Sequence, residues 1–258
     1  MDDLIKFPQL IAHRGYSECY PENTLIGLEA ALKAGADCIE FDVQFSKDGV
    51  PMVMHDIKLK RTTGVGGFVN EIPAVQLVHI SAGEKQRFGE QFNNEPIPTL
   101  SAVLKLLDQW PQATAFVEIK EETVEHFGVD SVAQCLVSAL TPYSDRCVLI
   151  SFNMPVLEAA KRMGIKRTGW VIQDWQDDSL QRAQKLKPDV LLCNYKKIPD
   201  VEHVLWKGPW QWALYDVIDP EVALRWVRRG AHYIETWDVG GLLNHKKIMS
   251  VFKGSGHG

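Results

Sequence analysis

The chain has 258 residues, of which 45% are hydrophobic and 24% are charged, a composition typical of a soluble globular protein that excludes a disordered one. It contains 28 Lys and Arg residues and 33 Asp and Glu residues. The resulting net charge of −5 argues against a nucleic-acid-binding protein, because such proteins carry a basic face or stripe. A length of about 250 residues is compatible with one large α/β barrel as well as with two smaller domains.

The N-terminus, the lack of a long apolar stretch and the cysteines predict a cytoplasmic protein. The first residues, 1–6, lack the basic and apolar regions of a secretory signal, and no apolar stretch approaches the ~20 residues of a membrane span. The cysteines form an odd set without a C-x-x-C pair, so we expect reduced thiols that lie mostly in the core. They are Cys19, Cys38, Cys135, Cys147 and Cys193.

Short β-rich runs alternate with amphipathic helical stretches along the chain. In the first helix, Leu25, Leu28 and Leu32 recur at helical spacing before Gly35 ends it. A turn at Asp48-Gly49 predicts that the second strand continues into a hairpin partner at 51–56. Strands that precede helices are predicted at 9–15, 38–46, 115–120, 147–152, 168–173, 190–195, 212–218 and 233–237. Helices are predicted at 21–35, 99–110, 130–140, 155–163, 179–187, 200–206, 220–229 and 243–252.

Eight strand–helix units in a chain of this length favour a (β/α)₈ TIM barrel over an open doubly wound sheet. We therefore predict one barrel domain over 1–258. The segment 57–96 interrupts the alternation and contains Gly64, Gly66 and Gly67, so it is expected as a small insertion after the second strand. That position lies on the loop side where barrel active sites occur. The last residues, 254–258, are expected to form a loose tail.

Two neighbouring barrel strands carry acidic residues on one face. Because alternate residues of a strand share a face, Glu40 and Asp42 point one way and their apolar neighbours the other. Glu118 and Lys120 repeat this pattern on the third strand. Inward carboxylates lose hydration and repel one another, a cost that a cation offsets, and three of them form the all-oxygen site that Mg²⁺ or Ca²⁺ prefers. The alternatives are carboxylates on a solvated edge and a plain Glu118–Lys120 contact along one strand.

Two histidines are expected at the same end of the barrel. His13 ends the first strand and His55 ends the hairpin, and imidazole titrates near neutrality, which suits an acid and a base. The guanidinium group of Arg14 can donate charge-assisted hydrogen bonds to an anionic oxygen. The alternatives are structural histidines and a solvent-facing arginine. The other histidines are expected to be structural or exposed: His79, His126, His203, His232, His245 and His257.

Motifs of several other enzyme classes are absent. The Gly64-Val65-Gly66-Gly67 run has Val69 where a dinucleotide-binding fingerprint needs its third glycine, and no strand precedes the run. The sequence contains no H-E-x-x-H, no Walker lysine and no G-x-S-x-G elbow. Zincin, nucleoside-triphosphatase and serine-hydrolase functions therefore have no support.

Several short motifs occur in a fixed order along most of the chain. They are Ile11-Ala12-His13-Arg14-Gly15, Pro21-Glu22-Asn23-Thr24, Glu40-Phe41-Asp42, Asp48-Gly49-Val50-Pro51 leading to His55-Asp56, Arg61-Thr62-Thr63-Gly64, Ile97-Pro98-Thr99-Leu100 and Glu118-Ile119-Lys120. This order resembles that of the glycerophosphodiester phosphodiesterase family. The resemblance implies a (β/α)₈ barrel with a small inserted segment and a divalent-cation-dependent hydrolase of small glycerophosphodiesters.

The resemblance also implies roles for individual residues. The implied metal ligands are Glu40, Asp42 and Glu118, the acid/base pair is His13 and His55, and the phosphate contacts are Arg14 and Lys120. The expected cofactor is one Mg²⁺ or Ca²⁺ ion, with Mn²⁺ as an alternative. The expected reaction releases sn-glycerol 3-phosphate and an alcohol, and the attacking oxygen would come from water or from the 2-hydroxyl of the substrate. Neither the preferred head group nor the oligomeric state follows from the sequence.

The C-terminal third departs from the family pattern. Where many members carry a Trp-Thr-Val-Asn type segment, this chain has Ala213-Leu214-Tyr215-Asp216-Val217, and Ile234-Glu235-Thr236-Trp237-Asp238 replaces an Ile-Thr-Asp-Arg-Pro type motif. Phe152, Tyr215 and Trp237 lie near strand ends, and we expect them to meet the alcohol group together with the insertion. Two other functions stay open: a lysophospholipase D-like or sphingomyelinase D-like enzyme acting on lipid, and a catalytically silent barrel that binds a phosphodiester.

Overall fold

The computed structural model describes residues 8–199, 205–246 and 248, and its strands lie close to the predicted positions. Eight of them are β1 Gln9–Ala12, β2 Cys38–Phe45, β4 Thr114–Ile119, β5 Cys147–Ser151, β6 Thr168–Val171, β7 Val190–Asn194, β8 Gln211–Tyr215 and β9 Tyr233–Thr236. The hairpin partner of β2 is β3, Pro51–Val53.

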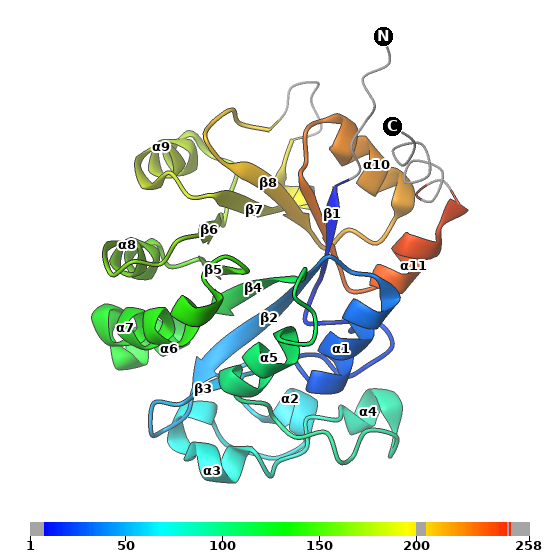
Figure 1. The fold of residues 1–258 in the computed structure, drawn as a ribbon, viewed down its shortest axis with the longest axis vertical. Coiled ribbons are helices and arrows are strands. Elements are labelled where there is room, and N and C mark those ends of the chain that lie inside the picture. Colours follow the sequence, from blue (N-terminus) through cyan, green and yellow to red (C-terminus); the bar gives the residue numbers. More distant parts are fainter. Residues whose placement is uncertain (1–7, 200–204, 247, 249–258) are drawn as a thin grey trace.

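Among the described residues these strands form one sheet in the order β1-β9-β8-β7-β6-β5-β4-β2-β3. A further pairing of β1 with β2 closes the sheet, and every pair except the antiparallel β2–β3 hairpin is parallel. The prediction of an eight-stranded TIM barrel is therefore confirmed, with β3 as an extra strand that leads into the insertion. Figure 1 shows the helices arranged around the strands.

The helices that follow the barrel strands are α1 Leu25–Ala34, α5 Leu100–Leu107, α6 Glu121–Phe127, α7 Val129–Leu140, α8 Met154–Arg162, α9 Asp177–Leu186, α10 Pro220–Arg228 and α11 Val239–Asn244. Short 3₁₀ turns η2 Thr141–Tyr143 and η3 Tyr195–Lys197 follow α7 and β7. Side-chain caps begin several helices: the Thr24 hydroxyl accepts from Gly27 N before α1, and the Asp219 carboxylate accepts from Glu221 N before α10.

Apart from shifts of a few residues at the ends of other elements, the structure differs from the predicted elements at three helices. Helix α6 was not predicted, because it is rich in acidic residues and buries only Thr123 and Val124. Helix α11 begins at Val239, ahead of the predicted 243–252, where Asp238 caps it. Most of the predicted helix at 200–206 lies outside the described residues, and Leu205 and Trp206 are not helical. The N-terminal residues 1–6 and the tail 254–258 also lie outside the described residues.

As predicted, alternate side chains of β2 point to opposite faces of the barrel wall. On β2, Ile39, Phe41 and Val43 are buried in the large core cluster between the barrel and its helices. Glu40 and Asp42 alternate with them and are each only 1% exposed. Since the apolar residues face the helices, the two carboxylates face the interior of the barrel.

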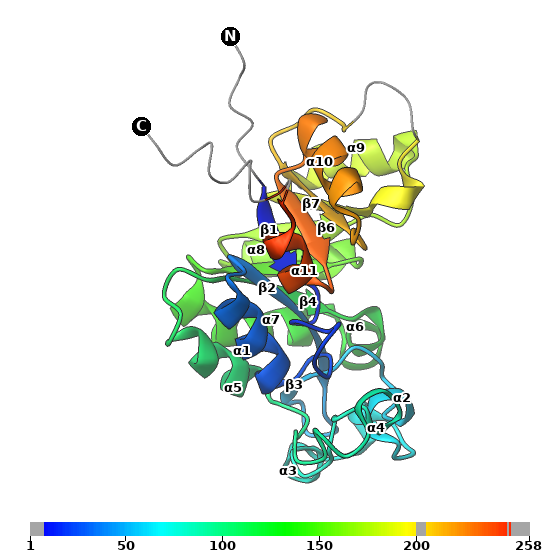
Figure 2. The same cartoon turned by 90° about the vertical axis from the view of Figure 1, so that its right-hand side faces the viewer.

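The insertion folds into small elements with a hydrophobic cluster of their own. Its elements are α2 Lys60–Thr63, η1 Val69–Glu71, α3 Ala74–Leu77 and α4 Lys85–Phe88. Leu59, Val69 and Leu77 pack with residues of the hairpin in this cluster. Figure 2 shows the insertion at one end of the molecule, below β3.

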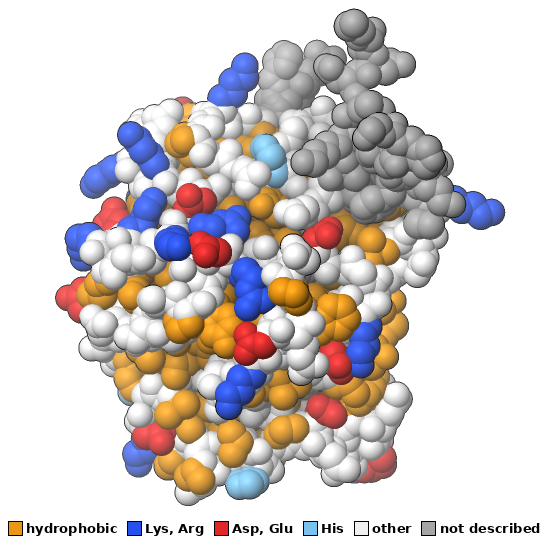
Figure 3. Space-filling model, viewed as in Figure 1, with side chains coloured by type: hydrophobic (Ala, Val, Ile, Leu, Met, Phe, Trp, Pro, Cys, Tyr) orange, Lys and Arg blue, Asp and Glu red, His pale blue; other side chains and the backbone are white. Residues whose placement is uncertain are grey.

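The surface carries charges of both signs. On the face shown in Figure 3, Lys and Arg side chains are interspersed with Asp and Glu. Helices long and apolar enough to cross a bilayer are absent from the described parts of the chain.

Candidate active site

The end of β1 places His13 and Arg14 at the mouth of the barrel. Directly after them the chain turns sharply, with φ of +56° at Arg14 and +84° at Gly15. A Cβ on Gly15 would come within 2.7 Å of the Gly27 backbone, so the turn requires glycine there. The turn aims the Arg14 backbone N–H at Glu40 Oε2, 3.0 Å away.

The strands β2 and β4 bring three carboxylates together. Asp42 and Glu118 are register partners on these neighbouring strands, and Glu40 lies two residues before Asp42 on the same face. Oxygens of Glu40, Asp42 and Glu118 all lie within 4.8 Å of one another. Asn23 holds the Asp42 carboxylate in place, because its Nδ2 donates to Asp42 Oδ2 at 2.9 Å and its Oδ1 accepts from Asp42 N at 3.1 Å. These three side chains could hold a metal ion.

The electrostatics of this cluster fit a bound cation. Glu40 Oε1 is buried without a hydrogen-bond partner. Burial, followed by repulsion from Asp42, raises the pKa of Glu40 well above its usual range. Burial also raises the pKa of Glu118, against the opposing charge of Lys120. Burial also acts to raise the pKa of Asp42. Nearby positive charges outweigh it, the Lys120 ammonium most of all, and hold the pKa of Asp42 well below the usual range. Mutually repelling carboxylates, one of which has an oxygen without a hydrogen-bond partner, form a donor set that a hard divalent cation stabilises.

Two cationic side chains balance part of this negative charge. Lys120 follows β4, and its Nζ lies 3.2 Å from Asp42 Oδ1 and 2.7 Å from Glu118 Oε1. Arg14 Nε lies 3.2 Å from Asp42 Oδ2 on the other side. Both side chains also line the adjoining cavity, so their N–H groups can reach an anionic oxygen that lies beside the carboxylates.

A buried glutamate on β9 faces His13. Glu235 is 4% exposed, and its Oε1 lies 3.5 Å from His13 Nε2. Burial, with repulsion from Glu118, raises the pKa of Glu235 well above its usual range. Burial, with the adjacent Arg14 charge, lowers the pKa of His13 to about 3. The His13 ring is therefore neutral near pH 7 and able to accept a proton.

The hairpin carries His55 to the same site. Gln44 Nε2 donates to the His55 carbonyl at 3.1 Å, which fixes the backbone after β3. The ring nitrogen Nδ1 of His55 lies 2.6 Å from Asp56 Oδ1. The other oxygen of Asp56 accepts from Arg61 Nε at 2.6 Å. With Nδ1 engaged in this way, Nε2 is the ring nitrogen left to exchange a proton with a ligand.

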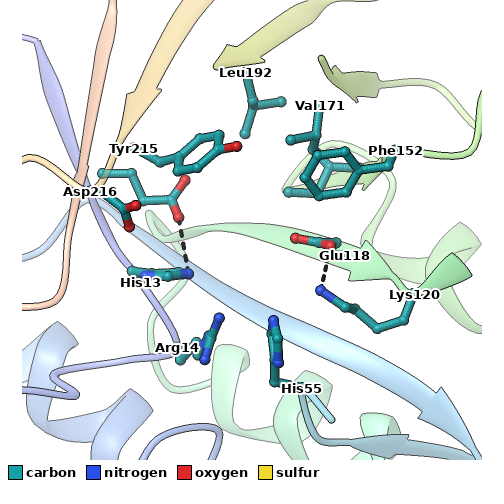
Figure 4. A pocket seen from close by; sticks show the side chains of 12 residues that line it. His13, Arg14, His55, Glu118, Lys120, Phe152, Val171, Leu192, Tyr215 and Asp216 are labelled. Atoms are coloured by element: carbon teal, nitrogen blue, oxygen red, sulfur yellow. Dashed lines mark hydrogen bonds and ion pairs between the residues drawn. The ribbon is translucent and has the colours of Figure 1, made fainter. Parts of the chain in front are cut away.

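These side chains surround a cavity of about 170 Å³ (Figure 4). Its polar lining consists of His13, Arg14, His55, Glu118, Lys120, Asp216 and Glu235. Its apolar lining consists of Ile150, Phe152, Val171, Leu192 and Tyr215. Figure 4 shows the aromatic and aliphatic side chains on the side opposite the two histidines and Arg14. These side chains form an apolar wall of the cavity, and charged side chains occupy the rest, with Asp216 beside Tyr215 and Glu118 below Phe152.

The expected aromatic lining is divided between two cavities. Phe152 and Tyr215 line the cavity beside the carboxylates, whereas Trp237 lines a neighbouring one of about 340 Å³. The neighbouring cavity also contains Arg87, a residue of the insertion. The first cavity is lined by residues of the barrel and of the hairpin. The expected contact between insertion and ligand is thus limited to the neighbouring cavity.

All residues predicted for the site lie together. His13, Arg14, His55, Glu118 and Lys120 line the cavity, and Glu40 and Asp42 complete the carboxylate cluster beside it. Sequence reasoning missed other residues that support the site, namely Glu22, Asn23, Asp56, Arg61 and Glu235. A signal for Glu235 was present, because an acidic residue within the buried run of β9 mirrors the pattern of β2.

The other described histidines lie away from these cavities. His79 and His126 are exposed, and His126 packs edge-on against Phe127. His232 precedes β9, and its Nδ1 accepts a hydrogen bond from Trp212 N at 3.1 Å. His203 and His257 lie outside the described residues.

Comparisons with known proteins agree with this geometry. Residues 13–234 match the sequence model of the "Glycerophosphoryl diester phosphodiesterase family". A protein of Caldanaerobacter subterraneus subsp. tengcongensis named glycerophosphodiester phosphodiesterase is 35% identical over 187 residues, which cover 69% of this chain and 74% of that protein. A protein of the same name from Bacillus altitudinis is 36% identical over 145 residues, covering 56% of this chain and 58% of that protein.

Solved structures share the fold along nearly the whole chain. A phosphodiesterase of Oleispira antarctica, solved in complex with the product sn-glycerol-3-phosphate, superposes with a TM-score of 0.79 at 24% identity and covers 96% of this chain and 97% of its own. A protein from Silicibacter pomeroyi described as a putative glycerophosphoryl diester phosphodiesterase gives the same TM-score at 20% identity, covering 95% and 94%. At these identities the likeness shows the barrel fold.

Proposed function

Because this chain belongs to the glycerophosphoryl diester phosphodiesterase family and is a phosphoric diester hydrolase, we propose that it converts glycerophosphodiesters to sn-glycerol 3-phosphate and an alcohol in the cavity between His13 and His55. One observation carries the proposal. Three buried carboxylates, two histidines and two cationic side chains, which come from three different strands and a hairpin, meet around one cavity.

Glu40, Asp42 and Glu118 would hold one divalent cation, either Mg²⁺ or Ca²⁺, or Mn²⁺ as an alternative. When bound, the cation neutralises negative charge on the phosphate. Arg14 and Lys120 share that role, because each forms an ion pair with Asp42 and each also lines the cavity. Preorganised N–H groups of this kind stabilise the charge that develops on the phosphate oxygens.

The two histidines divide the proton transfers. His13 accepts the proton of the attacking oxygen, because its half-buried ring is neutral at ordinary pH. His55 delivers a proton from Nε2 to the departing alkoxide, while Asp56 keeps hold of Nδ1. The alcohol group leaves toward the apolar wall formed by Phe152 and Tyr215.

A substrate panel tests the proposal. The chain, stripped with EDTA, is supplied with Mg²⁺, Ca²⁺ or Mn²⁺ and offered glycerophosphocholine, glycerophosphoethanolamine, glycerophosphoglycerol and a lysophospholipid. We expect metal-dependent release of glycerol 3-phosphate from the glycerophosphodiesters. Preferential cleavage of the lysophospholipid would instead identify a lysophospholipase D-like enzyme. Binding of the diesters without any turnover would identify a catalytically silent barrel.

Head-group selectivity is expected to depend on the apolar wall. Changing Tyr215→Ala should alter the ratio of kcat/KM between two head groups by about 10–200-fold, the range of roughly 1–3 kcal/mol that an apolar contact supplies. Affinity for the divalent cation should stay constant, because Tyr215 is not one of the three carboxylate side chains that would hold it. The ratio is measured by competing two diesters in one reaction.

The matched control for this prediction is Tyr215→Phe, which keeps the ring and removes only the hydroxyl. It should preserve the wild-type ratio. Equal losses on all head groups in Tyr215→Ala would place this residue in glycerol binding or in the fold.

A further inference from the structure

Arg61, on helix α2 of the insertion, uses all three of its guanidinium nitrogens on two carboxylates. Its Nε donates to Asp56 Oδ2 at 2.6 Å. Its two terminal nitrogens donate to the two oxygens of Glu22 at 2.8 and 2.7 Å. Glu22 belongs to the loop between β1 and α1, and it also accepts from Arg14 at 3.1 Å. One side chain of the insertion therefore connects the hairpin to the barrel.

This connection ends at the ring of His55. Asp56 Oδ1 lies 2.6 Å from His55 Nδ1, while Arg61 occupies the other oxygen of the same carboxylate. The Asp56 side chain is 29% exposed and the His55 side chain 30%, so both are accessible enough to water to change rotamer. Arg61, held in turn by the buried Glu22, is the contact that keeps the carboxylate turned toward the ring.

We propose that Arg61 is a positioning residue that orients His55 through Asp56, keeps a proton on Nδ1 and thereby leaves Nε2 as the ring nitrogen that gains and releases a proton. The role rests on the proposed function, which assigns the proton transfer to His55. A carboxylate at Nδ1 selects the neutral tautomer with its proton on Nδ1 and orients the ring. Without Arg61, Asp56 is free to turn toward water, and the ring loses both its tautomer preference and its orientation.

Lysine cannot replace arginine in this position. The Arg61 fork donates in one plane to both oxygens of Glu22 and, from Nε, to Asp56. A lysine ammonium is a compact charge that lacks this planar geometry. Arg61→Lys keeps the positive charge, but it should disturb the orientation of the His55 ring as Arg61→Met does.

Other contacts attach the insertion to the barrel independently of Arg61. Arg87 NH2 donates to the Ser17 carbonyl at 2.6 Å, and Arg87 NH1 donates to Glu84 at 2.9 Å. Glu84 also accepts from the Glu22 backbone N–H at 2.6 Å. The Arg61 variants are therefore expected to keep the insertion folded. Arg87→Met offers a control that removes a comparable contact between insertion and barrel without touching Asp56.

The first test reads the His55 tautomer by ¹⁵N NMR of the full chain, labelled at histidine, loaded with Mg²⁺ and free of substrate. The His55 signals are identified by their absence in His55→Gln. We expect the Nδ1–H tautomer in the wild type and in Arg87→Met, and loss of it in Arg61→Met, Arg61→Lys and Asp56→Ala. An unchanged Nδ1–H tautomer in the Arg61 variants would overturn the proposal.

The second test is kinetic. Arg61→Met should lower kcat by about 10–100-fold, the usual effect of removing a residue that orients a functional group. On a His55→Ala background the same change should alter kcat by no more than about twofold, because the ring that it orients is gone. Lys60→Met, which alters an exposed neighbour whose ammonium donates to the Gly64 carbonyl, should leave kcat unchanged. An equal fall in both backgrounds would show that Arg61 acts elsewhere.

The two tests separate this role from the proposed function. Since the NMR readout needs no substrate, it decides whether Arg61 sets the His55 tautomer even if no diester is hydrolysed. Turnover by the wild type together with an unaltered tautomer in the Arg61 variants would reject the positioning role alone.

Discussion

Replacing His13 or His55 by alanine will lower kcat by about 10²–10⁴-fold, the usual cost of losing a general acid or base. Each ring lines the cavity and carries one of the two proposed proton transfers. Cation affinity should change little, because neither ring belongs to the cluster of Glu40, Asp42 and Glu118; a loss of affinity in His13→Ala would assign the cation to the second possible group, His13, Glu40 and Glu235. Steady-state kinetics give kcat, and isothermal titration of the EDTA-treated protein gives the affinity. A near-wild-type kcat in either variant would leave that histidine with a structural role.

The pH dependence of kcat/KM separates the two histidines. The base must be neutral, so protonation of His13 removes activity as the pH falls, and burial lowers the pKa of His13 to about 3, which places this limb well on the acid side. The acid limb should therefore be lost in His13→Ala, and the profile of His55→Ala should lose the opposite limb. Exchanged limbs would exchange the two roles.

Removal of the divalent cation is expected to abolish turnover, and a hard divalent cation should restore it. The carboxyl oxygens of the cluster lie within 4.8 Å of one another, and one of them, Glu40 Oε1, has no hydrogen-bond partner. Asp42→Asn should weaken cation binding, because it removes one negative oxygen ligand while Asn23 can still hold the amide. Both effects are measured by titrating Mg²⁺ into the stripped protein while turnover is followed.

A matched control for Asp42→Asn is Glu29→Gln, which removes the same charge from helix α1, where Glu29 pairs with Lys33. It should retain wild-type cation affinity and turnover. Full activity in excess EDTA, with no metal found in the protein, would contradict the assignment of the carboxylates as ligands.

Local patterns were sufficient to predict the barrel and the centre of the site. The period of two along β2 placed Glu40 and Asp42 on the interior face, and the structure confirms their burial there. The ends of parallel strands meet at one edge of a barrel, so His13 and Glu118 could be brought together from sequence alone. Helix α1 followed from its leucine spacing and from Gly35, which adopts a left-handed conformation at the helix end.

Contacts made across long sequence separations could not be predicted in the same way. Closure of the barrel brings β9 beside β1, but the contact of the Glu235 carboxylate with the His13 ring depends on side-chain positions that the sequence does not give. Arg61 and Glu22 meet only after the insertion has folded back on the loop that follows β1. The sequence also did not predict helix α6, because this short acidic helix buries too few residues to show apolar residues at helical spacing.

The proposed hydrolysis is tested most directly by ³¹P NMR of sn-glycero-3-phosphocholine incubated with the protein and Mg²⁺. The signal of the phosphodiester should convert into that of sn-glycerol 3-phosphate while free choline accumulates, and His55→Ala at the same concentration should show almost no conversion in that time. Phosphocholine as the product would show that the other P–O bond is broken. No conversion of this or any other glycerophosphodiester with Mg²⁺, Ca²⁺ or Mn²⁺ would contradict the proposed function.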